Sequence, residues 1–139
     1  MQRFPLFLAL AALGACASAP PPPAASATFG VGVANEASTL AAARTPEEKS
    51  FVLLDILGRR VGQMEAAAKA GQRDLLASLA NAYRRIALEA LLGNLASAGP
   101  GAARAARVTL SVHEARLNRI SGARDAFLAC RFVLESLVP

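Results

Sequence analysis

The sequence is poor in the side chains on which most catalytic and metal sites depend. It has a single histidine, His113, two cysteines, Cys16 and Cys130, one tyrosine and no tryptophan. A lone histidine excludes a histidine pair or a His/Cys cluster with the usual zinc-ligand spacing. The sequence also contains neither a glycine-rich phosphate loop nor a haem-type Cys-x-x-Cys-His segment. We therefore expect a protein that is not an enzyme and that holds no metal or cofactor.

Long apolar runs and clustered aromatic rings are also lacking. The one apolar stretch at the N-terminus spans about 12 residues, whereas a membrane-spanning helix needs about 20. The net charge of +5 permits attraction to anionic lipids, anionic polymers or acidic proteins. Because almost no rings lie among the arginines, stacking on bases is disfavoured, and we expect no nucleic-acid partner.

The N-terminal stretch is built like an export signal. A short basic start, Met1 to Arg3, precedes the apolar run, which ends in Leu13-Gly14-Ala15-Cys16. Small residues in front of a cysteine at this point resemble the lipobox of bacterial lipoproteins. The resemblance implies that residues 1–15 are a signal peptide and that Cys16 carries the lipid anchor, including palmitate.

The same resemblance implies a location. Ala17 stands where an Asp would signal retention in the inner membrane, so the implied site is the cell outer membrane, facing the periplasm, if the organism is Gram-negative. Two alternatives remain open at this point. Ala17-Ser18-Ala19 is also an ordinary signal cleavage site, which would give a secreted soluble protein, and an uncleaved signal would act as an anchor itself.

Residues 16–45 have the composition of a tether. Pro20 to Pro23 favour the extended polyproline II conformation, at about 3.1 Å per residue, and alanines follow them. A helical turn or two over residues 36–44 is compatible with the sequence. We expect this stretch to hold the domain of residues 46–139 away from the bilayer.

The remainder of the chain is rich in Ala, Leu and Arg, which favour helices. Thr45, Pro46 and Glu48 form a capping-box pattern that predicts a helix over 46–70, ended by Gly71. Further helices are predicted over 73–95, 102–120 and 123–137, the last two separated at Ser121-Gly122. We expect an all-α antiparallel bundle of four helices, or of three if the last two are one kinked helix.

Apolar residues at helical spacing predict the core. The sets that face one another are expected to include Leu54, Leu57, Val61, Met64 and Ala68, then Leu75, Leu76, Leu79, Tyr83, Ile86 and Ala90, and then Ala106, Leu110, Leu117 and Ile120. His113 lies on the same arc, which favours a neutral, hydrogen-bonded core histidine over a pH-responsive contact. Cys130 lies among apolar neighbours, which favours a buried thiol over a reactive one.

Two surfaces are candidates for partner binding. Leu88, Leu92 and Leu95 form a second apolar stripe on the helix over 73–95, which predicts either a central position in the bundle or a partner interface. On the next helix, the face opposite the core arc combines basic and apolar side chains, namely Arg104, Arg107, Val108, Val112, Arg116 and Arg119. This face is either a solvated surface or a docking site for an acidic protein or anionic headgroups.

The sequence therefore predicts a membrane-anchored envelope lipoprotein with a non-catalytic protein-interaction domain. A lipid anchor joined to a small helical domain resembles the architecture of the helical secretin pilotins, without a shared motif. A structural lipoprotein that associates with itself is the alternative, and a small-ligand carrier is a further one.

Overall fold

The computed structural model describes residues 35–138. The predicted signal peptide, Cys16 and the proline run lie outside the described residues. Within the described part of the chain the secondary structure is helical, with no strand. The predicted all-α class is confirmed for this part of the chain.

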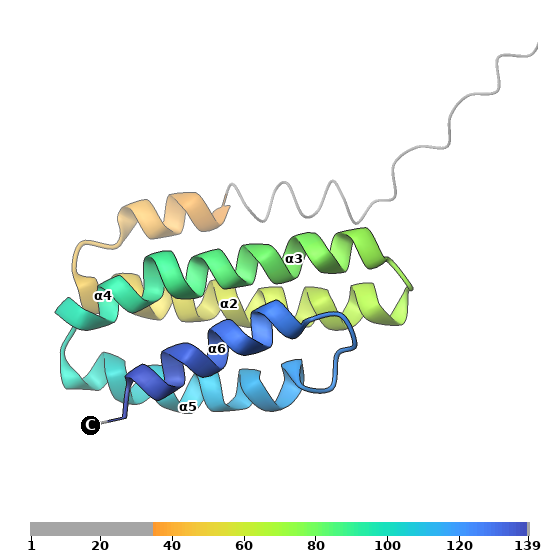
Figure 1. Cartoon of the computed structure of the whole chain (residues 1–139). Coiled ribbons are helices and arrows are strands. Elements are labelled where there is room, and N and C mark those ends of the chain that lie inside the picture. Colours follow the sequence, from red (N-terminus) through yellow and green to blue (C-terminus); the bar gives the residue numbers. More distant parts are fainter. Residues whose placement is uncertain (1–34, 139) are drawn as a thin grey trace, which may run out of the picture.

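Consecutive helical segments run in opposite directions along the molecule (Figure 1). One of these segments, residues 73–97, is continuous but changes its winding, because a π-helical stretch separates its two α-helices. The structure therefore contains more helical elements than the four predicted, and the count of four is not confirmed. The elements are α2 (Pro46–Lys69), α3 (Arg73–Arg85), the π-helix η1 (Ile86–Leu91), α4 (Leu92–Ser97), α5 (Pro100–Leu117) and α6 (Arg124–Ser136).

Local sequence signals explain where these helices begin and end. The Thr45 hydroxyl accepts a hydrogen bond from the Glu48 amide at 3.1 Å, and the Glu48 carboxylate accepts one from the Thr45 amide at 3.3 Å, which is the predicted capping box. Gly71 and Gly122 have φ angles of 68° and 99°, which L-residues with a side chain rarely adopt. The turn at Gly122 makes α5 and α6 separate helices, so the predicted break is confirmed.

The core lies where α2, the α3–α4 segment, α5 and α6 meet. It is apolar and alanine-rich, which allows the helices to approach closely. Leu75 and Ala68, which we expected in the core, are instead exposed, and Ala67 is buried in place of Ala68. Fully buried side chains include Leu57, Val61, Met64, Leu79, Tyr83, Leu91, Leu110, Leu117, Cys130 and Val133.

The π-helix changes which leucines face this core. The buried residues of the segment over 73–97 step by four from Tyr83 through Ala87 and Leu91 to Leu95. In an α-helix with 3.6 residues per turn, repeated steps of four rotate away from one face. A π-helix closes i→i+5 hydrogen bonds and holds more residues per turn, so it keeps these positions turned inward.

This winding also decides between the two predictions for Leu88, Leu92 and Leu95. Leu95 is buried, and Leu88 and Leu92 are partly buried against the same core. Of the two alternatives that the sequence left open for these leucines, the structure has the central position. They therefore do not form a free apolar surface.

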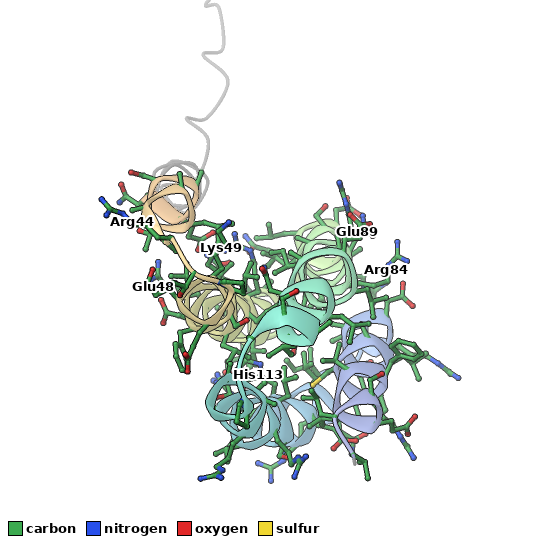
Figure 2. The ribbon with its side chains drawn as sticks, turned by 90° about the vertical axis from the view of Figure 1, so that its left-hand side faces the viewer. Arg44, Glu48, Lys49, Arg84, Glu89 and His113 are labelled. Carbon is green, nitrogen blue, oxygen red and sulfur yellow. The ribbon has the colours of Figure 1, made fainter. Side chains whose placement is uncertain are left out.

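A short helix over residues 35–42 lies against α2 rather than apart from the domain (Figures 1 and 2). Glu36 and Arg60 are only 6% and 4% exposed, and the Arg60 guanidinium donates to both carboxylate oxygens of Glu36. Gln63 accepts a further bond from Arg60 at 3.1 Å. The tether predicted to reach residue 45 thus includes a helix that is docked by a buried ion pair.

Candidate functional site

The outer face of α5 carries part of the predicted basic-apolar surface. Val108 and Val112 are 66% and 54% exposed and lie one helical turn apart, so together they form a small apolar surface. Arg104 on α5 and Arg119 in the turn that follows it are exposed and form no ion pair with any residue of the described region. Arg104, Val108 and Val112 lie on one side of α5, over about 12 Å at the α-helical rise.

The other two predicted arginines have structural partners. Arg107 donates a hydrogen bond to the Leu137 carbonyl at the end of α6. Arg116 turns toward α2 and donates through Nε and Nη2 to both carboxylate oxygens of Glu65, at 2.8 and 2.6 Å. These bonds hold the pKa of Glu65 below its ordinary value. The exposed surface therefore narrows to Arg104, Val108, Val112 and Arg119, which we call the α5 face.

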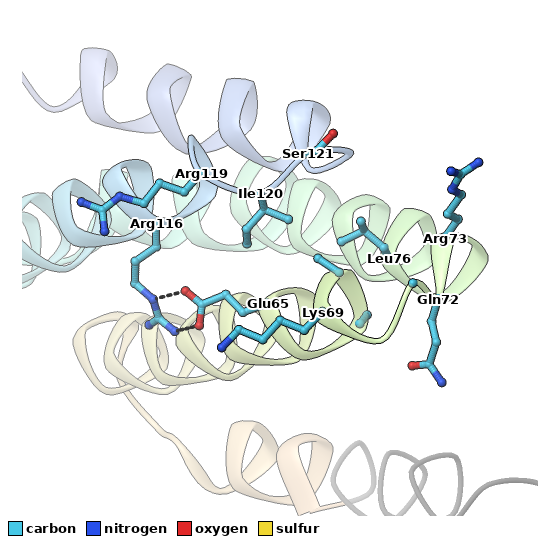
Figure 3. A pocket seen from close by; sticks show the side chains of 12 residues that line it. Glu65, Lys69, Gln72, Arg73, Leu76, Arg116, Arg119, Ile120 and Ser121 are labelled. Atoms are coloured by element: carbon cyan, nitrogen blue, oxygen red, sulfur yellow. Dashed lines mark hydrogen bonds and ion pairs between the residues drawn. The ribbon is translucent and has the colours of Figure 1, made fainter.

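Two hollows open along the junction of α2 and α5. The larger, of about 590 Å³, lies beside the turn that follows α2. Figure 3 shows the bidentate Arg116–Glu65 pair at its edge and the side chains of Leu76 and Ile120 directed into it, whereas Gln72 and Arg73 extend away. The second hollow, of about 520 Å³, is lined by Phe51, Gly58 and His113, and also by Arg116, so the two are neighbours.

His113 lies between α5 and α2 and is 4% exposed (Figure 2). Its Nδ1 atom is 3.1 Å from the Tyr83 hydroxyl, and the two rings meet edge to face. Burial lowers the pKa of His113 to about 4, and the nearby positive charge of Arg116 acts in the same direction. The imidazole is therefore neutral at pH 7, and the predicted hydrogen-bonded core histidine is confirmed.

Cys130 is fully buried, and its thiol donates a hydrogen bond to the Leu110 carbonyl at 3.2 Å. Burial raises the pKa of the thiol to about 11. A protonated thiol is a poor nucleophile, so the prediction of a buried, unreactive cysteine is supported by both burial and electrostatics. Ser111, two residues before His113, is exposed and donates to the Arg107 carbonyl of its own helix at 2.8 Å.

Neither a metal cluster nor a membrane span is present in residues 35–138. No three His, Cys, Asp or Glu side chains of this region lie close enough together to hold a metal ion. None of its helices combines the length and the apolarity that crossing a bilayer requires.

Some contacts of the site could not be read from the sequence. Tyr83 was expected on the core face of its helix, but nothing local pairs it with a histidine 30 residues away. The Glu65–Arg116 pair joins residues 51 apart, and the Glu36–Arg60 pair joins residues 24 apart. Gly58 lies directly against the His113 ring, 55 residues away along the chain, and no local pattern indicates this contact.

Comparison with known proteins gives no relative for this chain. No protein-family model matches the sequence, and no curated protein or solved structure matches it either.

Proposed function

We propose that this protein is a lipid-anchored lipoprotein of the bacterial envelope whose helical domain binds another envelope protein through the α5 face. The anchor is the lipidated Cys16, and the domain works as an antiparallel bundle of four helical segments in which α3, η1 and α4 form one segment. Its role is adaptor-like and non-catalytic, as in the pilotin architecture. The lipobox-like Leu13-Gly14-Ala15-Cys16 supports the anchoring half of the proposal.

One observation supports the binding half. Val108 and Val112 are exposed between Arg104 and Arg119, whose charges no described residue neutralises. Exposed apolar side chains flanked by free cations match a partner segment that is amphipathic and acidic. We therefore assign an acidic amphipathic helix of an envelope protein to the α5 face.

Site-specific photo-crosslinking in cells tests this assignment. A photo-reactive amino acid is placed at Val108 in the tagged full chain, and at Leu128 as a control, because Leu128 is an equally apolar side chain, 49% exposed, on α6. We expect one recurrent envelope protein captured from position 108 and not from 128, with acidic side chains in the crosslinked peptide. Capture that is equal at the two positions would overturn the assignment.

Charge variants give an independent readout. Arg104→Glu combined with Arg119→Glu should abolish the crosslink from position 108, because both cations would then repel an acidic segment. Arg124→Glu, at an exposed arginine on α6, is the matched control and should leave the crosslink unchanged. If only copies of this chain are crosslinked, the protein is a self-associating structural lipoprotein and the adaptor proposal fails.

The anchor is tested separately with Cys16→Ala. We expect the variant to leave the membrane fraction and to lose the partner crosslink. A variant that stays in the membrane fraction would overturn the interpretation of Cys16.

A further inference from the structure

The smaller hollow between α2 and α5 is lined by a buried histidine, one ring nitrogen of which has no partner among the described residues. His113 uses Nδ1 for its bond to Tyr83, and its Nε2 atom forms no hydrogen bond with any described residue. The ring is 96% buried, yet it lines the hollow. Nε2 is accessible from the hollow and not fully enclosed, so a ligand atom that enters the hollow can bind to it.

Gly58 is what leaves Nε2 open to the hollow. A Cβ atom at this position would lie 3.4 Å from Nε2 and 3.9 Å from Cε1 of His113, which is ordinary contact distance. Any larger residue would cover the ring edge. The missing side chain therefore leaves a space beside Nε2 that fits one small group.

The proton of the imidazole lies on Nε2. The Tyr83 hydroxyl is fully buried, and burial raises its pKa, so it keeps its proton and needs an acceptor. The neighbouring Cys130 sulfur is a weak acceptor, whereas His113 Nδ1 lies at 3.1 Å. Tyr83 thus donates to Nδ1, which leaves Nε2–H as a donor toward the hollow.

The charged groups around the hollow set the class of the ligand. Arg59 and Arg116 both line it; Arg59 forms ion pairs with Asp55 and Glu36, and Arg116 pairs with Glu65. Each guanidinium has five N–H donors, of which these pairs use only some. A donor at the base of the hollow and the remaining guanidinium N–H donors on its walls favour a small ligand with several acceptor oxygens, such as a carboxylate.

We propose that the α2–α5 hollow is a carboxylate-binding site in which His113 Nε2–H and the N–H groups of Arg59 and Arg116 that their ion pairs leave unused donate to the ligand. The site is distinct from the α5 face and does not rest on the proposed partner. Its ligand is any small carboxylate that reaches the ring edge beside Gly58, either a free organic acid or the side chain of an acidic peptide.

NMR spectroscopy of the imidazole nitrogens tests the proposal directly. His113 is the only histidine, so in the untagged full chain carrying Cys16→Ala its ring signals need no further assignment. We expect the Nε2–H tautomer in the absence of ligand. Sodium acetate, titrated against sodium chloride at constant ionic strength, should shift the Nε2 signal saturably, whereas acetamide should not.

Gly58→Ala is the decisive variant, because its methyl group covers Nε2 without a steric clash. It should weaken acetate binding at least tenfold, whereas Gly93→Ala, with nothing within 4 Å of its new methyl group, should leave it unchanged. Arg59→Gln, which alters a wall and not the ring edge, should weaken binding as well. Circular dichroism of each variant checks that it remains folded.

Four results would overturn the proposal. These are an Nδ1–H tautomer, no saturable shift with acetate, equal shifts in the wild type and Gly58→Ala, or equal shifts with acetate and acetamide. A capped glutamate in place of acetate then distinguishes the source: tighter binding than acetate indicates a peptide side chain, and weaker binding a free acid. None of these outcomes bears on crosslinking from Val108.

Discussion

Hydrogen bonds tie the buried polar side chains of this domain to specific partners. Ser50 donates to the Pro46 carbonyl at 2.8 Å, Tyr83 binds His113, and Cys130 binds the Leu110 carbonyl. In a core made mostly of alanine and leucine, the Tyr83–His113 and Cys130–Leu110 bonds join α3 and α6 to α5 and so favour one arrangement of these helices. Each bond is worth about 1 kcal/mol net, but an unpaired buried group would cost about 1–3 kcal/mol.

The protonation of His113 should make the free energy of unfolding depend on pH. Its pKa is about 4 in the folded protein and about 6.5 in the unfolded chain, so between these values the unfolded state binds the proton more readily. The contribution of His113 to the free energy of unfolding is therefore complete above pH 6.5 and is lost as the pH falls toward 4. We expect a loss of about 3 kcal/mol in urea-unfolding experiments.

His113→Gln provides the control for this dependence. Glutamine does not titrate, so the variant should be less stable at pH 7 but nearly independent of pH between 6.5 and 5. Wild-type protein whose unfolding free energy is unchanged over that interval would contradict the neutral, buried state of His113.

The Cys130 thiol should be unreactive in the folded protein. With a pKa of about 11, on the order of one thiol in a thousand is ionised at pH 8, and burial excludes the reagent as well. In the Cys16→Ala chain, where Cys130 is the only thiol, we expect reaction with a thiol-specific dye only as the protein unfolds. Native protein that reacts at the rate of an exposed thiol would show that Cys130 is accessible.

At the scale of the elements, the turns after α2 and α5 depend on glycine for different reasons. Gly71 has a φ of 68° with open space around it, whereas Gly122 has a φ of 99° and a Cβ there would lie 3.0 Å from Leu76 Cδ2. Gly122 thus combines an unusual backbone with close packing of the α5–α6 turn on α3. The turn sets the position of α6 against the core.

Alanine substitutions separate these two effects. Gly71→Ala should cost about 1 kcal/mol from backbone strain alone, and Gly122→Ala about 2–3 kcal/mol because Leu76 must also move. Gly93→Ala, in the helical α4 and without a close neighbour, should be neutral or stabilising by up to about 1 kcal/mol. Urea unfolding of the three variants measures how much free energy of unfolding each one loses. Equal losses for Gly71→Ala and Gly122→Ala would show that the contact with Leu76 adds nothing to the cost at Gly122.

At the scale of the whole molecule, the Glu36–Arg60 pair joins the first described helix to the rest of the domain. It joins the helix over residues 35–42 to α2, and both side chains are almost completely buried. Removing one partner of such a pair leaves a charge in the interior, which typically costs about 3–5 kcal/mol. The short helix is therefore expected to stay docked while the pair is intact.

Glu36→Gln should release this helix. We expect faster amide hydrogen exchange in residues 35–42, because a neutral amide cannot replace the carboxylate beside Arg60. Glu89→Gln, in an exposed i,i+4 pair with Arg85, is the control and should have no effect on that segment. Unchanged exchange in the Glu36 variant would mean that apolar contacts alone hold the helix.

Much of the helical framework follows from local sequence. The capping box at Thr45 and Glu48, the proline at the start of α2 and the glycines in two turns act over a few residues, and they located the helix ends to within about three positions. The apolar spacing of α2 and α5 identified much of the core on those helices, including His113, and the apolar neighbours of Cys130 predicted its burial. These signals are readable because each depends only on near neighbours along the chain.

The candidate sites depend on contacts that no local pattern contains. The π-helix turned Leu95 inward and removed a predicted surface, and pairing with Glu65 and Leu137 removed Arg116 and Arg107 from the α5 face. The sequence by itself determined an all-helical chain with caps, turns and amphipathic faces, because those features are short-range. Only the tertiary structure decided which polar groups meet, since helix winding and packing set the contacts between residues far apart in the sequence.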